Sequence, residues 1–276
     1  MIKKIAIQGE KASFHDIAAQ KYFGPNIEII CCETFKDSFN IVESGDAEYA
    51  LCAIENSLFG SINETYDLLV KFNFVIVGEV FLRISQSLIV LPGTKLQDIK
   101  EVYSHPVAIA QCEDFLDKHL PIAKRLEYYD TAASVEMIRN RKDKKNAAIA
   151  SSSAAKLYDL KILKEGIETN KQNYTRFVVI TKKPIFNEAA NKTSLIIRTN
   201  NNPGSLYRAL GVFAERSINI SKLQSRPIIG KAWHYIFYLD IDKGLNDKEL
   251  IDAFNDLKVQ KCELKILGSY LSGNKT

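Results

Sequence analysis

The residues best suited to chemistry stand together, just before a short apolar run. Asn173, Thr175 and Arg176 come directly before residues 177–180, which read Phe-Val-Val-Ile. A short β-branched run predicts a buried strand, and polar side chains at the mouth of such a strand commonly hold ligands in open α/β sheets. The structural alternative is that Asn-x-Thr forms an ordinary turn and that Arg joins a surface ion pair. These residues alone leave both interpretations open.

Similar polar residues lie at four further places where a predicted strand is followed by a predicted helix. They are Asn56-Ser57, Ser104, Thr131 and Ser151. Strand–helix alternation predicts parallel sheets, whose strand ends lie along one edge. Two lobes with facing edges would form a cleft of neutral donors and helix N-termini, which suits a small ligand with more than one carboxylate without repelling it. Helix capping without any ligand is the alternative for each residue.

Short apolar runs alternate with helical stretches and predict the elements that position these residues. A capping box spans residues 13–16, and a second cap is predicted at Thr34 with Asp37. The long apolar run 74–91 is interrupted at Gly78 and at residues 85–87, and it is predicted to pass from one lobe to the other. Strands are predicted at residues 5–7, 27–31, 49–54, 126–129 and 147–150, with a further strand ending at 103.

The chain changes character after a polar linker. Residues 182–192 are polar and contain Pro184. Beyond them the order βαββαβ is predicted, with strands at 193–199, 218–223, 232–241 and 259–267, which is a ferredoxin-like arrangement. Because about 80 residues is a marginal size for an independent domain, we expect this part to pair with another copy.

Composition excludes several classes of function. The 276 residues carry a net charge of +4, with 46% hydrophobic and 25% charged residues, as in an ordinary globular protein. The densest basic run, 139–145, contains Asp143, so nucleic-acid binding is not expected; Arg83 interrupts the longest apolar stretch, so a membrane span is not expected either. No signal peptide is visible, and the five cysteines and four histidines show no ligand spacing. We therefore expect free thiols, a cytoplasmic location, and neither metal nor cofactor.

Five motifs, in order along the chain, together resemble the prephenate dehydratase family. They are Glu55-Asn56-Ser57-x-x-Gly60-Ser61-x-Asn63-Glu64-Thr65; Ser104-His105-Pro106 with Gln111-Cys112; Asp130-Thr131-Ala132; residues 147–151; and Thr175-Arg176-Phe177. The resemblance runs nearly end to end. It implies an α/β fold with a two-lobed catalytic domain of parallel-type sheets, like type II periplasmic binding proteins, at residues 1–183, a linker at 184–192, and a ferredoxin-like ACT regulatory domain at 193–276. No chorismate mutase-like helical region precedes residue 1, so a monofunctional chain is expected.

The family's reaction removes water and CO2 from prephenate to give phenylpyruvate. By resemblance, Thr175 serves the leaving hydroxyl as a preorganised donor or as a proton relay. The substrate-binding candidates are Asn56, Ser57, Ser104, Gln111, Thr131 and Arg176. Arg176 could instead lock its loop through a buried carboxylate, which we favour, while Phe177 is expected in the core and Glu55 and His105 in structural roles.

The C-terminal part resembles a phenylalanine-binding ACT domain. Its effector motifs align with Asn201, Gly204, Ser205 and Leu206 and with Gln224, Ser225, Arg226 and Pro227. The resemblance implies phenylalanine bound between two such domains as a feedback effector, in a dimer or a dimer of dimers.

Two departures from the family pattern stand out. Gln224 replaces a glutamate in the effector motif, and Ala12-Ser13 and His15 stand where the family usually has Gly-Thr and Ser. The alternatives in function are an arogenate dehydratase, which performs the same chemistry on the amino-acid form, and a non-catalytic two-lobed binding protein with an amino-acid sensor domain.

Overall fold

The computed structural model describes residues 2–228 and 230–274. The chain divides into two compact units, one of Met1–Thr65 with Phe81–Phe177 and one of Tyr66–Val80 with Val178–Thr276. These limits differ from the predicted domain limits at residues 183 and 193, which stay a prediction.

The first sheet carries the N-terminal strands. Its order is β2-β1-β3-β11-β5, with β4 beside β3, and β1 pairs in parallel with both β2 and β3. The strands are β1 (Lys3–Gln8), β2 (Ile27–Cys32), β3 (Tyr49–Asn56), β4 (Gly60–Ser61), β5 (Val75–Arg83) and β11 (Tyr174–Thr181). The accompanying helices are α1 (Phe14–Phe23), α2 (Phe35–Ser44) and α3 (Asn63–Phe72).

Local caps explain where the first two helices begin. Thr34 and Asp37 form the predicted capping box of α2, and Gly45 ends that helix in the left-handed conformation. At α1, Ser13 caps the helix by accepting from Asp16 N. The second hydrogen bond of the predicted capping box, from the Ser13 backbone N–H to the Asp16 carboxylate, is not formed. The Asp16 carboxylate accepts from Ala12 N at 2.7 Å, because the Ser13 N–H already donates to Glu10 O.

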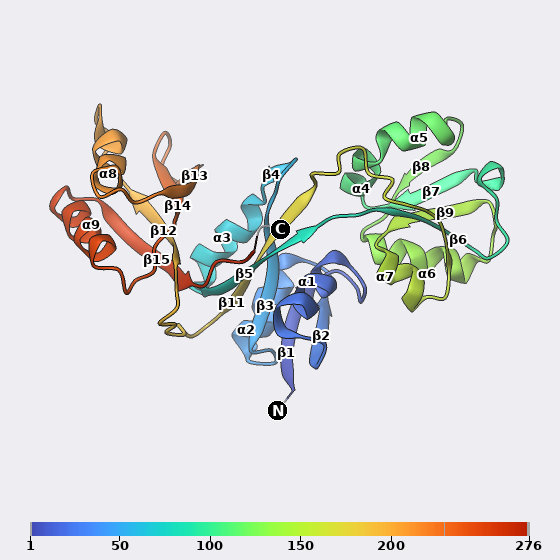
Figure 1. Cartoon of the computed structure of the whole chain (residues 1–276), viewed down its shortest axis with the longest axis horizontal. Helices are drawn as coiled ribbons and strands as arrows, with labels where there is room; N and C mark the ends of the chain where they lie inside the picture. Colours follow the sequence, from blue (N-terminus) through green and yellow to red (C-terminus); the bar gives the residue numbers. More distant parts are fainter. Residues whose placement is uncertain (1, 229, 275–276) are drawn as a thin grey trace. The chain divides into compact units, whose positions relative to one another are not determined.

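The second sheet is covered on both faces. Its order is β10-β6-β9-β7-β8, and the alternating residues of β6 and β9 enter two separate cores, as the strand period of two requires. One core contains side chains of α4 and α5 and the other those of α6 and α7, and Figure 1 shows the two pairs of helices on opposite sides of this sheet. The bounds are β6 (Ser87–Val90), β7 (Glu101–Ser104), β8 (Lys124–Glu127), β9 (Asn146–Ala150), β10 (Lys161–Glu165), α4 (Pro106–Gln111), α5 (Glu113–His119), α6 (Thr131–Arg141) and α7 (Ser152–Leu157), with a short 3-10 turn, η1, at Leu96–Asp98.

Three details of this lobe differ from the sequence-based expectation. Strand β10 was not predicted, and both β10 and β9 pair with β6 in antiparallel fashion, so the sheet is mixed rather than purely parallel. The helix expected after Pro106 breaks at Cys112 into α4 and α5. The long apolar run does split as predicted, because β5 joins the first sheet and β6 the second.

The C-terminal region has the predicted ferredoxin-like order. Strands β12 (Lys192–Arg198), β13 (Ile220–Pro227), β14 (Tyr235–Ile241) and β15 (Glu263–Tyr270) form an antiparallel sheet in the order β13-β14-β12-β15. Helices α8 (Ser205–Ala214) and α9 (Lys248–Val259) pack their apolar faces against one side of it, around Phe213 and Leu257. The predicted fold class, a two-lobed α/β region followed by a βαββαβ domain, is confirmed.

Candidate active site

A cavity of about 520 Å³ lies within the first unit and is lined by strands of the first sheet and by helices and loops that accompany both sheets. Its volume is in the range of small-molecule sites. Thr175, Asn56, Gln111 and Thr131 all line it, so four of the predicted site residues come together from distant parts of the chain.

Asn56 fixes the hydroxyl of Thr175. The Asn56 Oδ1 atom accepts from the backbone N–H groups of Leu58 and Phe59, at 3.0 and 3.1 Å. Because a backbone N–H can only donate, this end of the amide must be the oxygen. Nδ2 therefore faces the other way and donates to Thr175 Oγ1 at 3.0 Å and to Asn173 Oδ1 at 2.8 Å. Thr175 Oγ1 acts as an acceptor here, which leaves its own proton to point elsewhere.

The pairing of two strand ends brings these residues together. Asn56 closes β3 and Thr175 follows the first residue of β11, and these strands are neighbours in the sheet. Ser57 N donates to Tyr174 O at 2.8 Å, and Tyr174 N donates to Ser57 Oγ at 2.9 Å. These hydrogen bonds hold Asn56 and Thr175 side by side where β3 ends and β11 begins.

The first turns of five helices line the cavity, among them that of α3 at Glu64. Ser13 and His15 come from the start of α1, Thr34 from the cap of α2, His105 from the cap of α4, and Thr131 from the start of α6. Helix N-termini carry partial positive charge and unpaired N–H groups, so they favour carboxylates.

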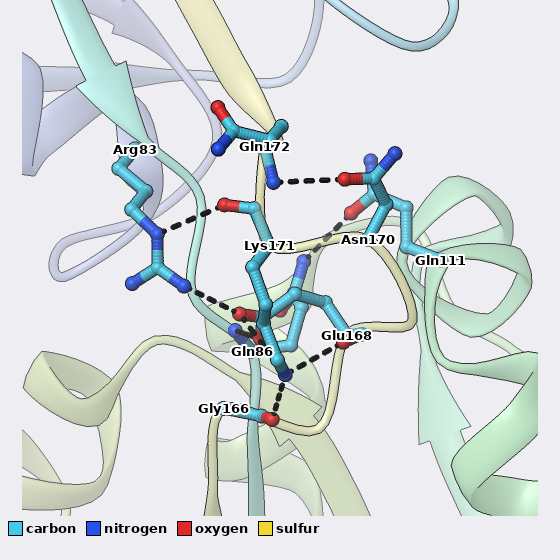
Figure 2. Close-up of polar contacts among 8 residues, drawn as sticks. All are labelled: Arg83, Gln86, Gln111, Gly166, Glu168, Asn170, Lys171 and Gln172. Atoms are coloured by element: carbon cyan, nitrogen blue, oxygen red, sulfur yellow. Dashed lines mark hydrogen bonds and ion pairs between the residues drawn. The ribbon is translucent and has the colours of Figure 1, made fainter.

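Gln111 is oriented by a residue of the connection between the sheets. Gln86 Nε2 donates to Gln111 Oε1 at 3.1 Å, which leaves the Gln111 Nε2 group to donate. Figure 2 shows both amides beside Glu168, a buried carboxylate that accepts from Gln86 N at 2.8 Å and pairs with Arg83 at 3.0 Å. This network ties the segment before β6 to the segment before β11. Gln86 itself lines the cavity, and its Oε1 is buried without a hydrogen-bond partner among the described residues.

The two cavity histidines are neutral. Burial lowers the pKa of His15 to about 3, and it also lowers the pKa of His105. Ala53 N donates to His15 Nε2 at 3.3 Å, and Val107 N donates to His105 Nδ1 at 3.3 Å. Each ring therefore carries its proton on the other nitrogen.

The cavity also contains carboxylates, contrary to the expectation of a purely neutral lining. Glu33, Glu64 and Asp130 line it, while no Lys or Arg is among the described lining residues. Asp130 caps α6 by accepting from Ala133 N at 2.9 Å, and burial raises the pKa of its carboxyl. Glu33 and Glu64 are exposed, so their charge is partly screened by solvent.

The loop before α1 carries one of the departures from the family pattern. Ala12 has φ 63°, a left-handed conformation in which a Cβ is unfavourable. Its carbonyl accepts a hydrogen bond at 2.7 Å from Ser151 Oγ, and Ser151 directly follows β9 of the second sheet. Gly9, at φ 93°, lies so close to Asp130 that a Cβ there would be 2.7 Å from Oδ2. The backbone geometry thus explains why glycine suits both positions.

Three predicted site residues do not line the cavity. Ser57 Oγ donates to Gln172 O at 2.8 Å, and the fully buried Ser104 donates to Ile149 O at 2.5 Å. Arg176 is buried and pairs with Glu55 at 3.8 Å; that carboxylate is about one-third exposed rather than buried. Their assignment to substrate stays a prediction.

Sequence reasoning did not select two lining residues of interest, Gln86 and His15. The signal for Gln86 was a polar residue inside the apolar run 74–91. His15 was noted only as a departure from the family pattern, and its packing against Phe35 and Phe177, with ring centroids 5.6 and 5.0 Å away, is visible only in the structure.

The predicted effector residues lie on two elements of the C-terminal domain. Gly204 caps α8 in the left-handed conformation, with Asn201 just before it and Ser205 and Leu206 opening the helix. The second group, Gln224, Ser225, Arg226 and Pro227, belongs to β13, an edge strand of its sheet. In the second unit, Arg226 pairs with Asp67 at 2.7 Å. Their effector role stays a prediction.

Among the described residues, no three or more His, Cys, Asp or Glu side chains are grouped so that they could hold a metal ion. In the same part of the chain, no helix combines the length and apolarity that a membrane span requires. The described cysteines are free thiols.

Comparison with known sequences gives matches along the whole chain. The family model described as prephenate dehydratase matches residues 5–185, and that described as ACT domain matches residues 193–259. A bifunctional chorismate mutase/prephenate dehydratase of Aquifex aeolicus is 36% identical over 97% of this chain and 73% of its own length. Arogenate dehydratase 2 of Petunia hybrida is also 36% identical, over 98% of this chain and 72% of its own.

Solved structures share the fold. The prephenate dehydratase of Arthrobacter aurescens, in complex with L-Phe, has a TM-score of 0.88 and 29% identity, covering 99% of this chain and 91% of that one. GqqA, described as a novel type of quorum quenching acylase, also has a TM-score of 0.88, with 32% identity and 98% coverage of both chains. With motifs, fold, cavity and family model in agreement, the chain belongs to the prephenate dehydratase family.

Proposed function

We propose that this protein converts prephenate to phenylpyruvate, water and CO2, as a decarboxylating carbon–oxygen lyase. The observation that carries the proposal is that the Thr175 hydroxyl accepts a hydrogen bond from Asn56. Since Asn56 Nδ2 donates to Thr175 Oγ1 at 3.0 Å, the Thr175 proton is free to point into the cavity that the residue lines.

The leaving hydroxyl is the part of the reaction that needs this proton. When the C–O bond breaks, its electron pair stays with the oxygen, and the pair of the bond to the ring carboxylate moves into the ring. The carboxylate leaves as CO2, and the oxygen gains a proton and leaves as water. Thr175 donates to the oxygen as its charge develops, and solvent restores the proton. A fixed donor of this kind accelerates a reaction by roughly 10²–10³-fold.

The substrate's carboxylates are held by neutral groups. Gln111 presents its Nε2 group, Thr131 stands at the N-terminus of α6, and Asn56 supports the hydroxyl end. Ser57 and Ser104 support the site through their backbone contacts. Arg176 supports the strand mouth through Glu55, rather than contacting substrate.

The C-terminal domain supplies regulation. In this proposal residues 1–183 form the catalytic domain, 184–192 the linker and 193–276 the ACT domain. Two copies pair through their ACT domains, and L-phenylalanine binds between Asn201, Gly204, Ser205 and Leu206 of one copy and residues 224–227 of the other. Support comes from the edge position of β13 in its sheet and from the L-Phe complex of the Arthrobacter aurescens relative. Feedback requires different affinity of the effector for two states. A cytoplasmic homo-oligomer follows from this role.

Family membership favours an enzyme over a non-catalytic binding protein, and the described contacts do not favour an acylase. Amide hydrolysis needs a nucleophile activated by an adjacent base. In the described cavity, His15 and His105 receive hydrogen bonds from backbone amides, and no contact of either ring with a hydroxyl is described. Arogenate dehydratase is the nearer rival, because its chemistry is the same.

The test is direct. The purified protein is mixed with prephenate, and phenylpyruvate is followed by its absorbance with and without L-phenylalanine. Thr175→Val, which keeps the shape and removes the hydroxyl, should lower kcat by at least ~10²-fold with unchanged circular dichroism. Absence of product from the parent at every phenylalanine concentration would refute the assignment, whereas near-parental turnover by the variant would remove Thr175 from the mechanism.

A further inference from the structure

His15 presents an unused hydrogen-bond donor to the cavity. Its Nε2 accepts from Ala53 N at 3.3 Å, so that nitrogen carries a lone pair. The proton of the neutral ring is then on Nδ1, and no described residue accepts a hydrogen bond from that atom. Since His15 lines the cavity, a bound ligand is the remaining partner for this N–H group.

The ring is held rigidly and remains neutral. His15 packs edge-on against Phe35 and Phe177, with centroids 5.6 and 5.0 Å away. Burial lowers its pKa to about 3, so the ring does not become an imidazolium near neutral pH. A rigid neutral ring in this tautomer offers the cavity a donor and no acceptor, because its lone pair is used by Ala53 N.

The position of His15 matches one end of the substrate. Thr175 and Phe177 are two residues apart on β11, and both line the cavity. Two residues along a strand span about 6.6 Å, comparable to the distance across a six-membered ring between a hydroxyl and a para side chain. If the leaving hydroxyl lies at Thr175, the imidazole of His15, which packs against Phe177, faces the opposite end of the substrate. That end of prephenate carries the three-carbon side chain.

We propose that His15 selects the keto acid over the amino acid by donating its Nδ1–H to the keto oxygen of the substrate side chain. This inference rests on the proposed function and deepens it. In prephenate the group beside the side-chain carboxylate is a carbonyl, which accepts a hydrogen bond. In arogenate the same position is an ammonium, which can only donate, so two donors would face each other.

Two substitutions separate this role from a structural one. In His15→Gln the side-chain oxygen can replace Nε2 and keep the bond from Ala53 N, while the Nδ1 donor is lost. In His15→Asn the side-chain amine can replace Nδ1 and keep the donor, while the bond to Ala53 is lost. If His15 determines specificity, the variant that loses the donor, His15→Gln, should lose the preference. If His15 has only a structural role, the variant that loses the contact with Ala53, His15→Asn, should be the more impaired.

The experiment measures kcat and KM of the parent and both variants on prephenate and on arogenate. His15→Gln should raise KM for prephenate about 10-fold, the effect of one lost hydrogen bond, with kcat nearly unchanged. The parent's preference for prephenate over arogenate should fall by at least the same factor. His15→Asn should keep that preference within about 3-fold while lowering the thermal unfolding midpoint.

The outcomes distinguish this inference from the proposed function. An unchanged preference in His15→Gln, or a larger loss of preference in His15→Asn, overturns the role of His15 while the enzyme assignment stands. A parent that prefers arogenate also overturns it. A parent that converts neither substrate refutes the proposed function itself. Nitrogen NMR of labelled His15 checks the premise, since a protonated Nε2 would contradict the assigned tautomer.

Discussion

Replacing Asn56 by aspartate should reverse the direction of the hydrogen bond at Thr175. In the parent, Asn56 Oδ1 accepts from Leu58 N and Phe59 N, and Nδ2 donates to Thr175 Oγ1. In Asn56→Asp one carboxylate oxygen can keep both backbone bonds. The other takes the place of Nδ2, 3.0 Å from Thr175 Oγ1, and can only accept. Thr175 must then donate to the carboxylate, and its proton is no longer available to the substrate.

The expected magnitude follows from that lost donor. Removing a fixed donor from a developing oxyanion costs about 10²–10³ in kcat, or about 2.7–4 kcal/mol. The fold should survive, because the buried Nδ2 of Asn173 has no partner among the described residues and can turn to donate to the new carboxylate. Asn56→Ala is the matched control, since it removes the support but adds no acceptor, and it should lower kcat only about 10-fold.

Steady-state kinetics on prephenate would test whether Asn56→Asp is less active than Asn56→Ala, and circular dichroism would check that both variants fold. The decisive comparison is between the two variants, because both lose the amide and only one captures the hydroxyl proton. If Asn56→Asp retained kcat within about 10-fold of the parent, or was more active than Asn56→Ala, then Thr175 would not donate in the way the geometry implies.

Three further predictions concern stability and are measured by urea unfolding. Ala12→Gly should change the unfolding free energy by less than about 1 kcal/mol, because relief of its left-handed backbone offsets the lost methyl group; Ala18→Gly inside α1 should cost about 2 kcal/mol. His15 has a pKa of about 3 when folded and about 6.5 when unfolded, so below pH 6.5 only the unfolded chain gains this proton. Between pH 7.5 and 5.0 the unfolding free energy of the parent should therefore fall by about 2 kcal/mol more than that of His15→Gln. Equal decreases in the two proteins would contradict a neutral His15 ring in the folded state. In the second unit Lys192 Nζ lies 3.0 Å from both oxygens of the buried Glu79, so Lys192→Met should cost about 3–5 kcal/mol and a second change, Glu79→Gln, should restore part of it; no recovery would mean that the loss arises from packing.

Local signals predicted most of the fold because they are strong in this chain. The predicted cap at Thr34 with Asp37 begins α2, and the polar break predicted at residues 85–87 separates β5 from β6. Strand β10 was missed because residues 161–165, Lys-Ile-Leu-Lys-Glu, do not alternate charged and apolar side chains, and its pairing with β6 is set by tertiary contact. The antiparallel strands of the second sheet could not be deduced from strand–helix alternation, which describes connections and not directions.

The site was predicted less completely, since its chemistry depends on which atom faces which. The sequence marked Asn56 and Thr175 as candidates, but it could not show that two backbone amides fix the Asn56 oxygen. Polar residues at strand ends looked alike in the sequence, yet Ser104 is fully buried and bonded to Ile149 O, while Thr131 lines the cavity. Likewise His15 becomes significant only because Ala53 assigns its tautomer.

The proposed reaction makes different demands on the two ends of its substrate, and the described cavity reflects them. The hydroxyl must gain a proton as it leaves, so a hydroxyl whose proton is available, as at Thr175, helps the transition state more than the ground state. The ring carboxylate must instead lose its charge as CO2. A bidentate arginine there would stabilise the carboxylate most strongly before it reacts, and that binding energy would oppose its departure. Neutral groups such as Gln111 and the N-terminus of α6 bind the carboxylate more weakly, so less stabilisation is lost when the charge moves into the ring. The described lining has a donor hydroxyl and no Lys or Arg, and two of its three carboxylates, Glu33 and Glu64, are exposed and partly screened by solvent. Such a lining stabilises the ring carboxylate only weakly before CO2 leaves, which is what the proposed reaction requires.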